Sequence, residues 1–269
     1  MVRKGEGTVT ENSGGYYDIR RDVLPIVVTT RHGYPTIKGF MGTGFLVGKG
    51  LFVTCHHCVA APVAEEDTYA VITPIEYAPE LRKDVPDASF FVTRLGGLEQ
   101  DPSGLDLAIG WPGRDPVGLI LSGEGVSEMG EDVRTYGYPL TQDMPHPEGA
   151  GRSLTIDGRL LKGYITTNYM NEVPSYGPTP TDELDMPAPR GLSGAPIVRA
   201  SSREVIGVVY GTKDTGTVEE FSRVDEETGE RTPELERVTA NVVTHMLDSL
   251  HNLSGEVTHG MPLIEYLRA

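Results

Sequence analysis

The sequence predicts an all-β protein. Most apolar residues fall in short runs, such as "VLPIVVTT", "GFLVG", "LFVT", "DLAIGW", "APIVRA" and "EVIGVVYGT". These runs are rich in Val and Ile and are bounded by Gly, Pro, Asp and Ser, which favours strands over helices. Glycine (33) and proline (20) are spread along all 269 residues without a repeat. The regular spacing of the runs is typical of a β-barrel or β-sandwich.

Three segments differ from this pattern. Residues 1–21 are polar and glycine-rich, which predicts a flexible lead-in. Residues 213–237 are charged and poor in apolar side chains, which predicts a long hairpin or surface insertion. Apolar residues at helical spacing predict an amphipathic helix over 239–253, and Gly255 suits its end; they are Val243, Met246, Leu247, Leu250 and Leu253.

The charge balance argues against polyanionic partners. The chain has 23 basic and 39 acidic residues, for a formal net charge of −16. Nucleic acid and anionic membranes need Lys and Arg to neutralise phosphates, so neither is expected as a partner. The amino-terminal stretch lacks the apolar core of a secretory signal, and no run is long enough to span a bilayer. A cytoplasmic location is therefore expected.

The stretch "FVTCHHCVA", residues 52–60, holds both cysteines, Cys55 and Cys58, around His56 and His57. Two cysteines do not make a disulfide framework. Taken locally, the stretch is compatible with a metal site, a redox pair or the surroundings of a catalytic base. A zinc site would need two further ligands of good geometry. This stretch could supply only His56, because a His57 bound to zinc could not act as a base.

A second stretch, "RGLSGAPIV" at residues 190–198, places Ser193 between glycines. Glycines permit a tight backbone whose N–H groups can converge on an oxyanion. A serine hydroxyl is a weak nucleophile and needs a base, for which His57 is the candidate. The base needs a carboxylate to fix its tautomer, and Asp106 in "SGLDLAIGW" is the candidate.

The order His57, Asp106, Ser193 and its three local contexts resemble the chymotrypsin-like (trypsin-like) serine proteases. "VTCHHC" is similar to the family's T-A-A-H-C, "DLAI" to its D-I/L-A-L strand, and "GLSGAP" to its G-D-S-G-G-P. The resemblance covers residues 22–253. Within the family, the chain most resembles the bacterial high-temperature-requirement proteases, without their PDZ domain.

The resemblance implies two six-stranded antiparallel β-barrels with a C-terminal helix and the site between the barrels. The first barrel would span residues 22–120 and carry His57 and Asp106. The second would span 121–269, carry Ser193 and include the charged insertion and the helix. The oxyanion hole would be the N–H groups of Gly191 and Ser193.

Departures from the family bear on activation and on the cysteines. Leu192 stands where secreted members have an aspartate that pairs with a new N-terminus, so activation by clipping is not expected. Ala195 replaces a glycine. Animal relatives pair the cysteine at position 58 with one at the position of Gly42, so here both cysteines are expected to be buried, unpaired hydrophobes. No metal and no cofactor are expected.

The resemblance places substrate-binding residues at Pro187 and along Val209, Tyr210 and Gly211. Pro187 occupies the position that sets charge preference in animal enzymes, so preference for Arg or Lys is unsupported. Asp185 and Lys213 lie near the expected pocket walls and could bias specificity in opposite directions.

The function expected is that of a serine endopeptidase that hydrolyses polypeptides through a His-Asp-Ser triad and an acyl-enzyme. Activity should rise with pH through an apparent pKa of about 7, because His57 must be neutral. Two alternatives remain open: a bacterial protease kept latent until a regulatory protein partner binds, and a protease-like binding or scaffold module without hydrolysis.

Overall fold

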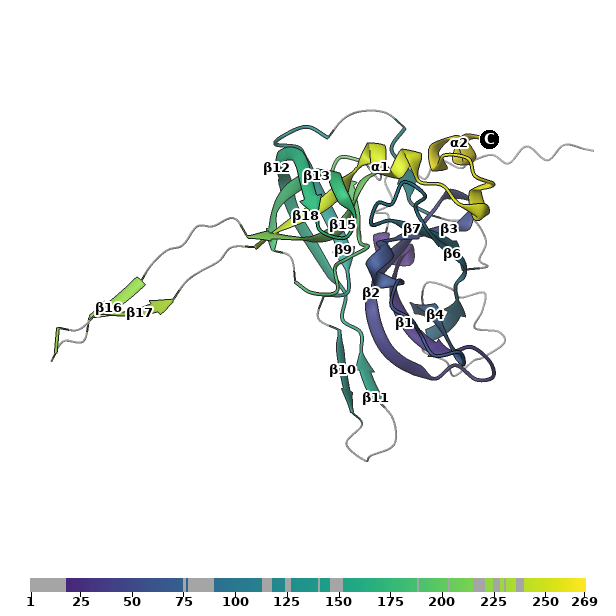
Figure 1. The fold of residues 1–269 in the computed structure, drawn as a ribbon, viewed down its shortest axis with the longest axis horizontal. Coiled ribbons are helices and arrows are strands. Elements are labelled where there is room, and N and C mark those ends of the chain that lie inside the picture. The colour runs from purple at the N-terminus through teal and green to yellow at the C-terminus, as the bar shows by residue number, and fades with distance from the viewer. Residues whose placement is uncertain are drawn as a thin grey trace, which may run out of the picture.

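The computed structural model describes residues 18–74, 76, 90–112, 118–123, 127–139, 141–145, 152–187, 189–202, 204–214, 221–224, 228–229, 231–235 and 240–269. Two seven-stranded sheets lie side by side, and the C-terminal helices cover one end of the pair (Figure 1). Nearly all strand pairs are antiparallel, the exception in these sheets being the short β8–β15 pair.

The first sheet has the order β5-β4-β1-β2-β3-β7-β6. Register shifts between β1 and β2 curl it, as bulges do in barrels. The concave face encloses large side chains that are fully buried, Leu24, Ile26, Phe45 and Phe52 among them. Its strands are β1 (Val23–Thr30), β2 (Ile37–Val47), β3 (Leu51–Thr54), β4 (Asp67–Pro74), β5 (Phe90–Arg94), β6 (Gly96–Gln100) and β7 (Ala108–Trp111).

The second sheet has the order β14-β9-β12-β13-β18-β15-β8, and β14 also pairs with β15. This additional pairing closes six of the strands into a barrel, whose core includes Ile165, Leu184, Ile197 and Ile206. Its strands are β8 (Ile120–Leu121), β9 (Asp132–Gly137), β12 (Arg159–Val173), β13 (Gly177–Pro187), β14 (Pro196–Arg199), β15 (Glu204–Asp214) and β18 (Ala240–Met246).

The expected all-β, chymotrypsin-like fold is therefore confirmed. The expected count of six strands fits the second barrel. The first sheet differs, because among its described residues it is a curled sheet of seven strands whose edge strands β5 and β6 do not pair with each other.

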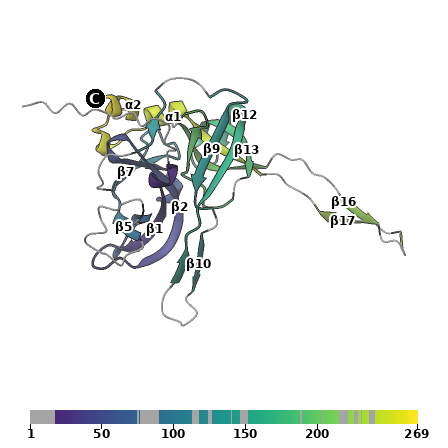
Figure 2. The same ribbon diagram turned by 180° about the vertical axis from the view of Figure 1, so that it is seen from behind.

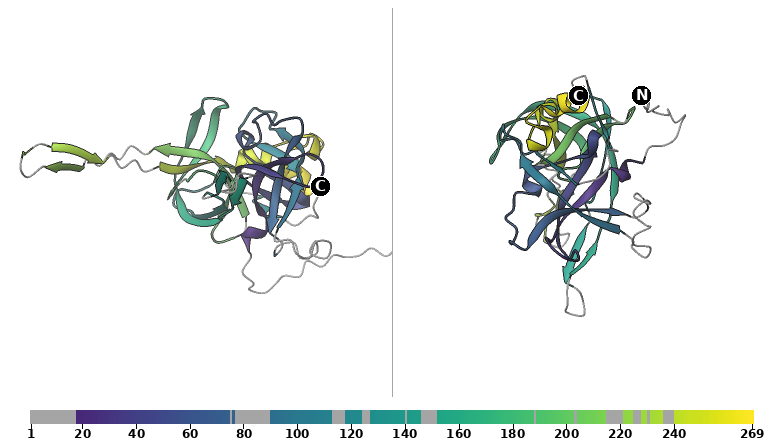
Figure 3. Two further views of the ribbon diagram at one scale, coloured as in Figure 1. Left: turned by 90° about the horizontal axis from the view of Figure 1, so that it is seen from below. Right: turned by 90° about the vertical axis from the view of Figure 1, so that its right-hand side faces the viewer.

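Two hairpins form separate two-stranded sheets. Strands β10 (Gln142–Pro145) and β11 (Arg152–Thr155) pair and point away from the barrels (Figure 2). Strands β16 (Phe221–Val224) and β17 (Arg231–Leu235) pair at a distance from them (Figure 3). The latter hairpin falls within the predicted insertion 213–237, although β15 continues to Asp214.

Short 3-10 turns connect some strands: η1 (Ile19–Arg21), η2 (Gly48–Gly50), η3 (His56–Cys58) and η6 (Glu256–Thr258). The first of them, η1, lies at the end of the segment 1–21 that was predicted to be a flexible lead-in, so the last residues of that segment form a turn. Asp18 caps η1 by accepting a hydrogen bond from the Arg20 N–H at 3.1 Å, and Ile19 is buried. Residues 1–17 of the predicted lead-in lie outside the described residues.

The predicted helix over 239–253 is wrong in its first half. Residues 240–246 form β18, and the helix α1 covers only Leu247–Asn252. Strand β18 lies between β13 and β15, and both of its faces are covered, so Val242 and Val243 are both buried. A strand buried on both faces gives a continuous apolar run that periodicity cannot distinguish from a helix.

After β18 the chain crosses from the second barrel to the first. Leu250 and Leu253, together with Leu263 of α2 (Leu263–Arg268), pack into the core of the first sheet. Lys49 Nζ donates to the carbonyl of Tyr266 at 2.6 Å. In the described part of the chain, none of the helices has the length and apolar character to cross a membrane.

Candidate active site

His57 and Asp106 are brought together by the pairing of β3 with β7. Thr54, the last residue of β3, lies opposite Ala108. His57 follows β3 in the turn η3, and Asp106 lies two positions before the start of β7. The Asp106 carboxylate accepts two hydrogen bonds from His57, one from Nδ1 to Oδ2 at 2.6 Å and one from the backbone N–H to Oδ1 at 2.8 Å. Both carboxylate oxygens thus fix the imidazole.

The environment of this pair is asymmetric. The side chain of Asp106 is 3% exposed, whereas that of His57 is 40% exposed and so can meet a ligand. Burial lowers the pKa of His57, but the hydrogen bond to Asp106 and the neighbouring Cys58 outweigh this effect and raise it above the ordinary value of 6.5. The pair is therefore built to stabilise an imidazolium.

Ser193 lies in the tight loop between β13 and β14. Gly191 and Gly194 adopt φ values of +94° and +84°, a region that favours glycine. A Cβ on Gly194 would lie 1.9 Å from the carbonyl oxygen of Thr43, so no larger residue fits without displacing β2. Gly194 is thus required by the close approach of the loop to the first sheet, and Gly191 by its positive φ and its contact with the Tyr138 carbonyl.

Thr43 joins this loop to the first sheet. Its N–H donates to the carbonyl of Ser193 at 2.9 Å, and its Oγ1 donates to the carbonyl of Gly191 at 2.8 Å. Oγ1 also accepts from the N–H of Tyr138 at 3.2 Å, and Thr54 Oγ1 donates to the Thr43 carbonyl at 2.7 Å. One buried threonine therefore orients the serine loop through its N–H and its hydroxyl, while its carbonyl is held by Thr54.

Sequence reasoning missed Thr43. It predicted from Leu192 that the loop must be organised without an ion pair, and Leu192 does lie in the apolar core of the second barrel. The replacement tether comes from 150 positions earlier in the chain. The signal was the stretch "GTGFLVG", in which a hydroxyl residue stands between two glycines within β2, the strand that pairs with β3.

The serine loop leaves two amides available. Within the described part of the chain, neither Gly191 N–H nor Ser193 N–H donates a hydrogen bond. Ser193 lies beside η3, because Cys58 Sγ contacts its carbonyl at 3.6 Å. The structure forms no hydrogen bond between the two described side chains of His57 and Ser193. It thus places the serine loop next to the His57–Asp106 pair without joining their side chains.

The two cysteines are buried free thiols. Cys55 Sγ donates to the carbonyl of Val209 at 3.1 Å, across to the second barrel. A Cβ on Gly42 would lie 2.6 Å from Cys58 Sγ, so Gly42 makes room for this sulfur. Burial and nearby negative charge raise the pKa of Cys55 well above its usual value, which keeps it a thiol.

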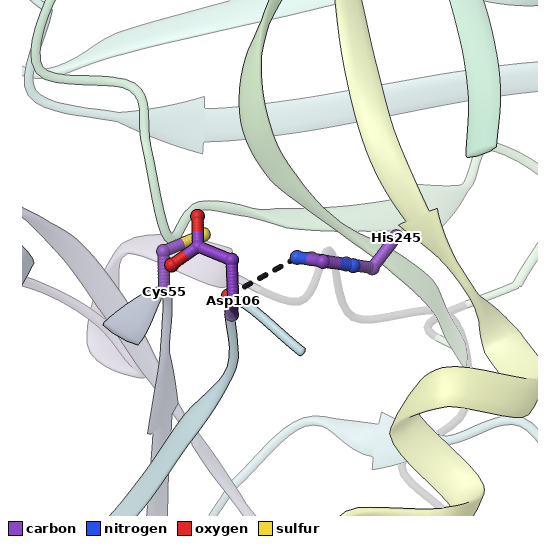
Figure 4. A group of neighbouring side chains, drawn as sticks. All are labelled: Cys55, Asp106 and His245. Atoms are coloured by element: carbon purple, nitrogen blue, oxygen red, sulfur yellow. Dashed lines mark hydrogen bonds between the residues drawn. The ribbon is translucent and has the colours of Figure 1, made fainter. Parts of the chain in front are cut away.

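Cys55, Asp106 and His245 form the one described group with metal-ligating atoms close together, within 4.8 Å of one another (Figure 4). Each of these groups already has a partner. Both Asp106 oxygens accept from His57, Cys55 Sγ donates to Val209, and His245 Nε2 contacts the Asp106 carbonyl at 3.1 Å. The donor set does not fit a metal unless the His57–Asp106 pair is broken.

His56 contacts a tyrosine rather than the Asp106 carboxylate. Its Nδ1 lies 3.3 Å from the hydroxyl of Tyr176, in the turn between β12 and β13, and the two rings meet edge to face. Burial lowers the pKa of His56, and the neighbouring His57 adds to this effect. His56 is therefore a neutral packing residue at neutral pH.

The predicted substrate-binding residues occupy different environments. Pro187 is exposed at the end of β13, and Gly211 is partly exposed on β15. Val209 requires a correction, because its side chain lies in the barrel core and its main-chain groups are bonded to Gly194 and Ala195. It supports the serine loop and has no group free for substrate.

Tyr210 is also largely buried, and its hydroxyl bonds Thr181 and Asn171. Lys213 Nζ lies 3.6 Å from the buried carboxylate of Glu183 and 4.0 Å from the centre of the Tyr169 ring. Its charge is thus already compensated. Asp185 is exposed.

The fold and these groups define a class: a curled sheet and a β-barrel arranged as in the chymotrypsin-like fold, with a histidine–aspartate pair on the first and a glycine-bounded serine on the second. The sequence profile of the trypsin-like peptidase domain matches residues 42–208. This match spans more than half of the chain and includes all three residues, so the chain belongs to the trypsin-like peptidase family.

Solved structures share this fold. The Rv3671c protease of M. tuberculosis in its active form has a TM-score of 0.51 at 17% identity, over 85% of this chain and 77% of that chain. The MamO protease domain of Magnetospirillum magneticum in its apo form has a TM-score of 0.54 at 13% identity, over 90% of this chain and 96% of that chain. No curated protein sequence matches significantly. At these identities the similarity concerns the fold alone.

Proposed function

We propose that this protein is a serine endopeptidase in which Ser193 is the nucleophile, His57 the general base and Asp106 the carboxylate that orients it. The observation that supports this most is that two hydrogen bonds join His57 to Asp106, beside a serine loop in which the N–H groups of Gly191 and Ser193 donate no hydrogen bond to the described residues. A binding domain has no evident need for this combination of groups.

In the proposed reaction, His57 Nε2 accepts the Ser193 proton as Oγ attacks the scissile carbonyl of a polypeptide. The N–H groups of Gly191 and Ser193 stabilise the oxyanion, and the Asp106 carboxylate stabilises the imidazolium. His57 then protonates the leaving amine, and an acyl-enzyme on Ser193 remains. Water activated by the same histidine hydrolyses this ester and regenerates the serine.

The substrate is proposed to bind along β15. Beyond Val209, the edge of β15 opposite β18 has no strand partner among the described residues, since β14 pairs only as far as Val208. An extended polypeptide could therefore add to this edge near Gly211, with Pro187 at the wall of its first specificity site. Charge preference is not expected to follow Lys213, because Glu183 compensates it.

The experiment is covalent labelling with a fluorophosphonate, which reacts with an activated serine. The wild-type protein should be labelled at Ser193 and should hydrolyse a peptide library, whereas Ser193→Ala should lose both properties and keep its thermal stability. The loss of turnover should be on the order of 10⁶-fold. Hydrolysis that persists in the alanine variant would refute the assignment. A folded wild-type protein that neither hydrolyses nor reacts, even after addition of cell extract, would support the scaffold alternative.

We also propose that the protein is kept at low activity in a bacterial cytoplasm until a regulatory protein partner binds. Two observations support this: the side chains of His57 and Ser193 are not hydrogen-bonded, and both cysteines are free thiols, which agrees with a reducing compartment. The expected result is weak labelling of the purified protein that increases on addition of cell extract. Full labelling without extract would contradict latency.

A further inference from the structure

His245 is a buried histidine that the proposed mechanism does not use. It lies on β18, in the second barrel, and is fully buried. Its Nε2 contacts the backbone carbonyl of Asp106 at 3.1 Å (Figure 4). Asp106 belongs to the first sheet, so this bond joins the residue that orients the base to the barrel that carries the serine.

The chemistry of this contact fixes the state of His245. A carbonyl oxygen can only accept, so Nε2 must carry the proton and donate it. Nδ1 is then a lone pair, and it is buried without a partner. Burial, with a smaller contribution from the nearby His57, lowers the pKa of His245 to about 4, and the carboxylate and carbonyl of Asp106 oppose this only in part. Cys55 and Tyr210 are the other ionisable groups beside it. His245 is therefore a neutral donor of fixed tautomer across the neutral range.

The ring of His245 is itself held in place by Tyr210. The two ring centres are 4.6 Å apart at an interplanar angle of 41°. The Tyr210 hydroxyl bonds Thr181 Oγ1 at 2.7 Å and accepts from Asn171 Nδ2 at 2.8 Å. The imidazole is thus clamped between a tyrosine anchored on β12 and β13 and the main chain of Asp106, which leaves it little freedom to rotate.

The same strands hold the serine loop. His245 pairs with Val208 in the β15–β18 ladder. The next residue, Val209, donates to the Ala195 carbonyl at 2.9 Å and accepts from the Gly194 N–H at 2.7 Å. A continuous set of contacts therefore runs from Asp106 through His245 and β15 to the loop of Ser193. A shift of one barrel against the other would strain these bonds.

We propose that His245 is a positioning residue that sets the location of Asp106, and through it of His57, relative to the nucleophile loop of the second barrel. This proposal rests on the proposed peptidase function. It differs from a packing role, because it requires a donor at the place of Nε2 and not only an apolar ring of similar size.

The test compares two substitutions at one site. His245→Gln keeps an N–H donor near the place of Nε2, and His245→Leu fills a similar volume without a donor. We expect His245→Leu to lower kcat by about tenfold with little change in KM, because a hydrogen bond of this kind changes an equilibrium by about that factor. His245→Gln should recover most of that loss. The acidic limb of the pH profile should also shift in the Leu variant, since its Asp106 holds His57 less well.

His251→Leu is the matched control. His251 Nε2 donates to the carbonyl of Ser122 at 2.6 Å, a bond of the same type on α1, away from the site. This variant should lose stability without any change in kcat or in the pH profile.

The outcomes are separable. If wild-type protein hydrolyses no peptide and takes no fluorophosphonate label, the proposed function fails. If wild-type protein is active and both His245 variants match it in kcat and pH profile, the positioning role is refuted. A second result would also refute the proposal. If His245→Leu and His245→Gln reduce kcat equally, and if His251→Leu reduces it in the same proportion to its loss of stability, then His245 is a packing residue.

Discussion

Replacing Thr43 by valine tests how the serine loop is oriented without an ion pair at Leu192. Valine has almost the same shape as threonine but removes Oγ1. Two main-chain groups then lose their partner: the Gly191 carbonyl, which accepts at 2.8 Å, and the Tyr138 N–H, which donates at 3.2 Å. Because the Thr43 side chain is fully buried, water cannot replace the hydroxyl in place.

The magnitude follows from these two groups. An unsatisfied buried polar group costs about 1–3 kcal/mol. Tyr138 is buried, whereas Gly191 is partly exposed and can recover some hydration, so we expect a total loss of about 2–3 kcal/mol. If about 1–2 kcal/mol of this loss destabilises the ordered conformation of the serine loop, the population with a formed oxyanion site drops roughly 5- to 30-fold.

The assay is steady-state hydrolysis of one peptide substrate together with thermal unfolding. Thr43→Val should lower kcat roughly 5- to 30-fold with a smaller change in KM, because the edge of β15 is untouched. Thr43→Ser should keep kcat near that of the wild type, since it retains the hydroxyl.

Thr29→Val is the matched control for stability. Thr29 is equally buried, and its Oγ1 donates to the carbonyl of Thr36 at 3.1 Å on the far part of β1. This variant should unfold at a lower temperature and keep its kcat. The reasoning about Thr43 fails if Thr43→Val also keeps its kcat while it loses as much stability as Thr29→Val.

The remaining predictions concern the histidine–aspartate pair and its surroundings. Asp106→Asn should reduce kcat by roughly 10⁴-fold, because the amide no longer fixes the Nδ1–H tautomer of His57; a loss below tenfold in a correctly folded variant would exclude this role. The pH profile of kcat/KM should rise through a pKa above 6.5, since Asp106 raises the pKa of His57 and the base must be neutral; the value of about 7 expected from the sequence lies on this side. The same raised pKa stabilises the fold fully below pH 6.5, and the contribution is lost as the pH rises through the folded-state pKa, which urea unfolding at several pH values would measure; an ascending limb below 6.5 would contradict both statements. Finally, His57→Ala should be inactive while His56→Ala keeps most activity, and chelators should leave both activity and stability unchanged, because both Asp106 oxygens and Cys55 Sγ are already bonded within the chain; stoichiometric zinc whose removal abolishes activity would show that the Cys55, Asp106 and His245 group is a metal site.

The sequence by itself determined the fold class and the identity of the candidate triad. Short Val- and Ile-rich runs bounded by turn residues are a local signal, and they predicted an all-β chain. His57, Asp106 and Ser193 were recognisable because each sits in a short motif whose chemistry depends on its immediate neighbours. Leu192 likewise showed from its position alone that an ion pair at the serine loop is absent.

Only the tertiary structure decided what supports these residues. Thr43 and Gly191 lie far apart in the sequence, as do Asp106 and His245, and no spacing rule links either pair. Val209 was predicted to bind substrate, but its side chain is buried in the core of the second barrel. Residues 240–246 have an apolar pattern that suits a helix, and their burial between β13 and β15 made them a strand. Local patterns record the groups that a chain carries, whereas partners for buried polar atoms are chosen when distant strands pack, because each such atom must find its hydrogen bond wherever the fold provides one.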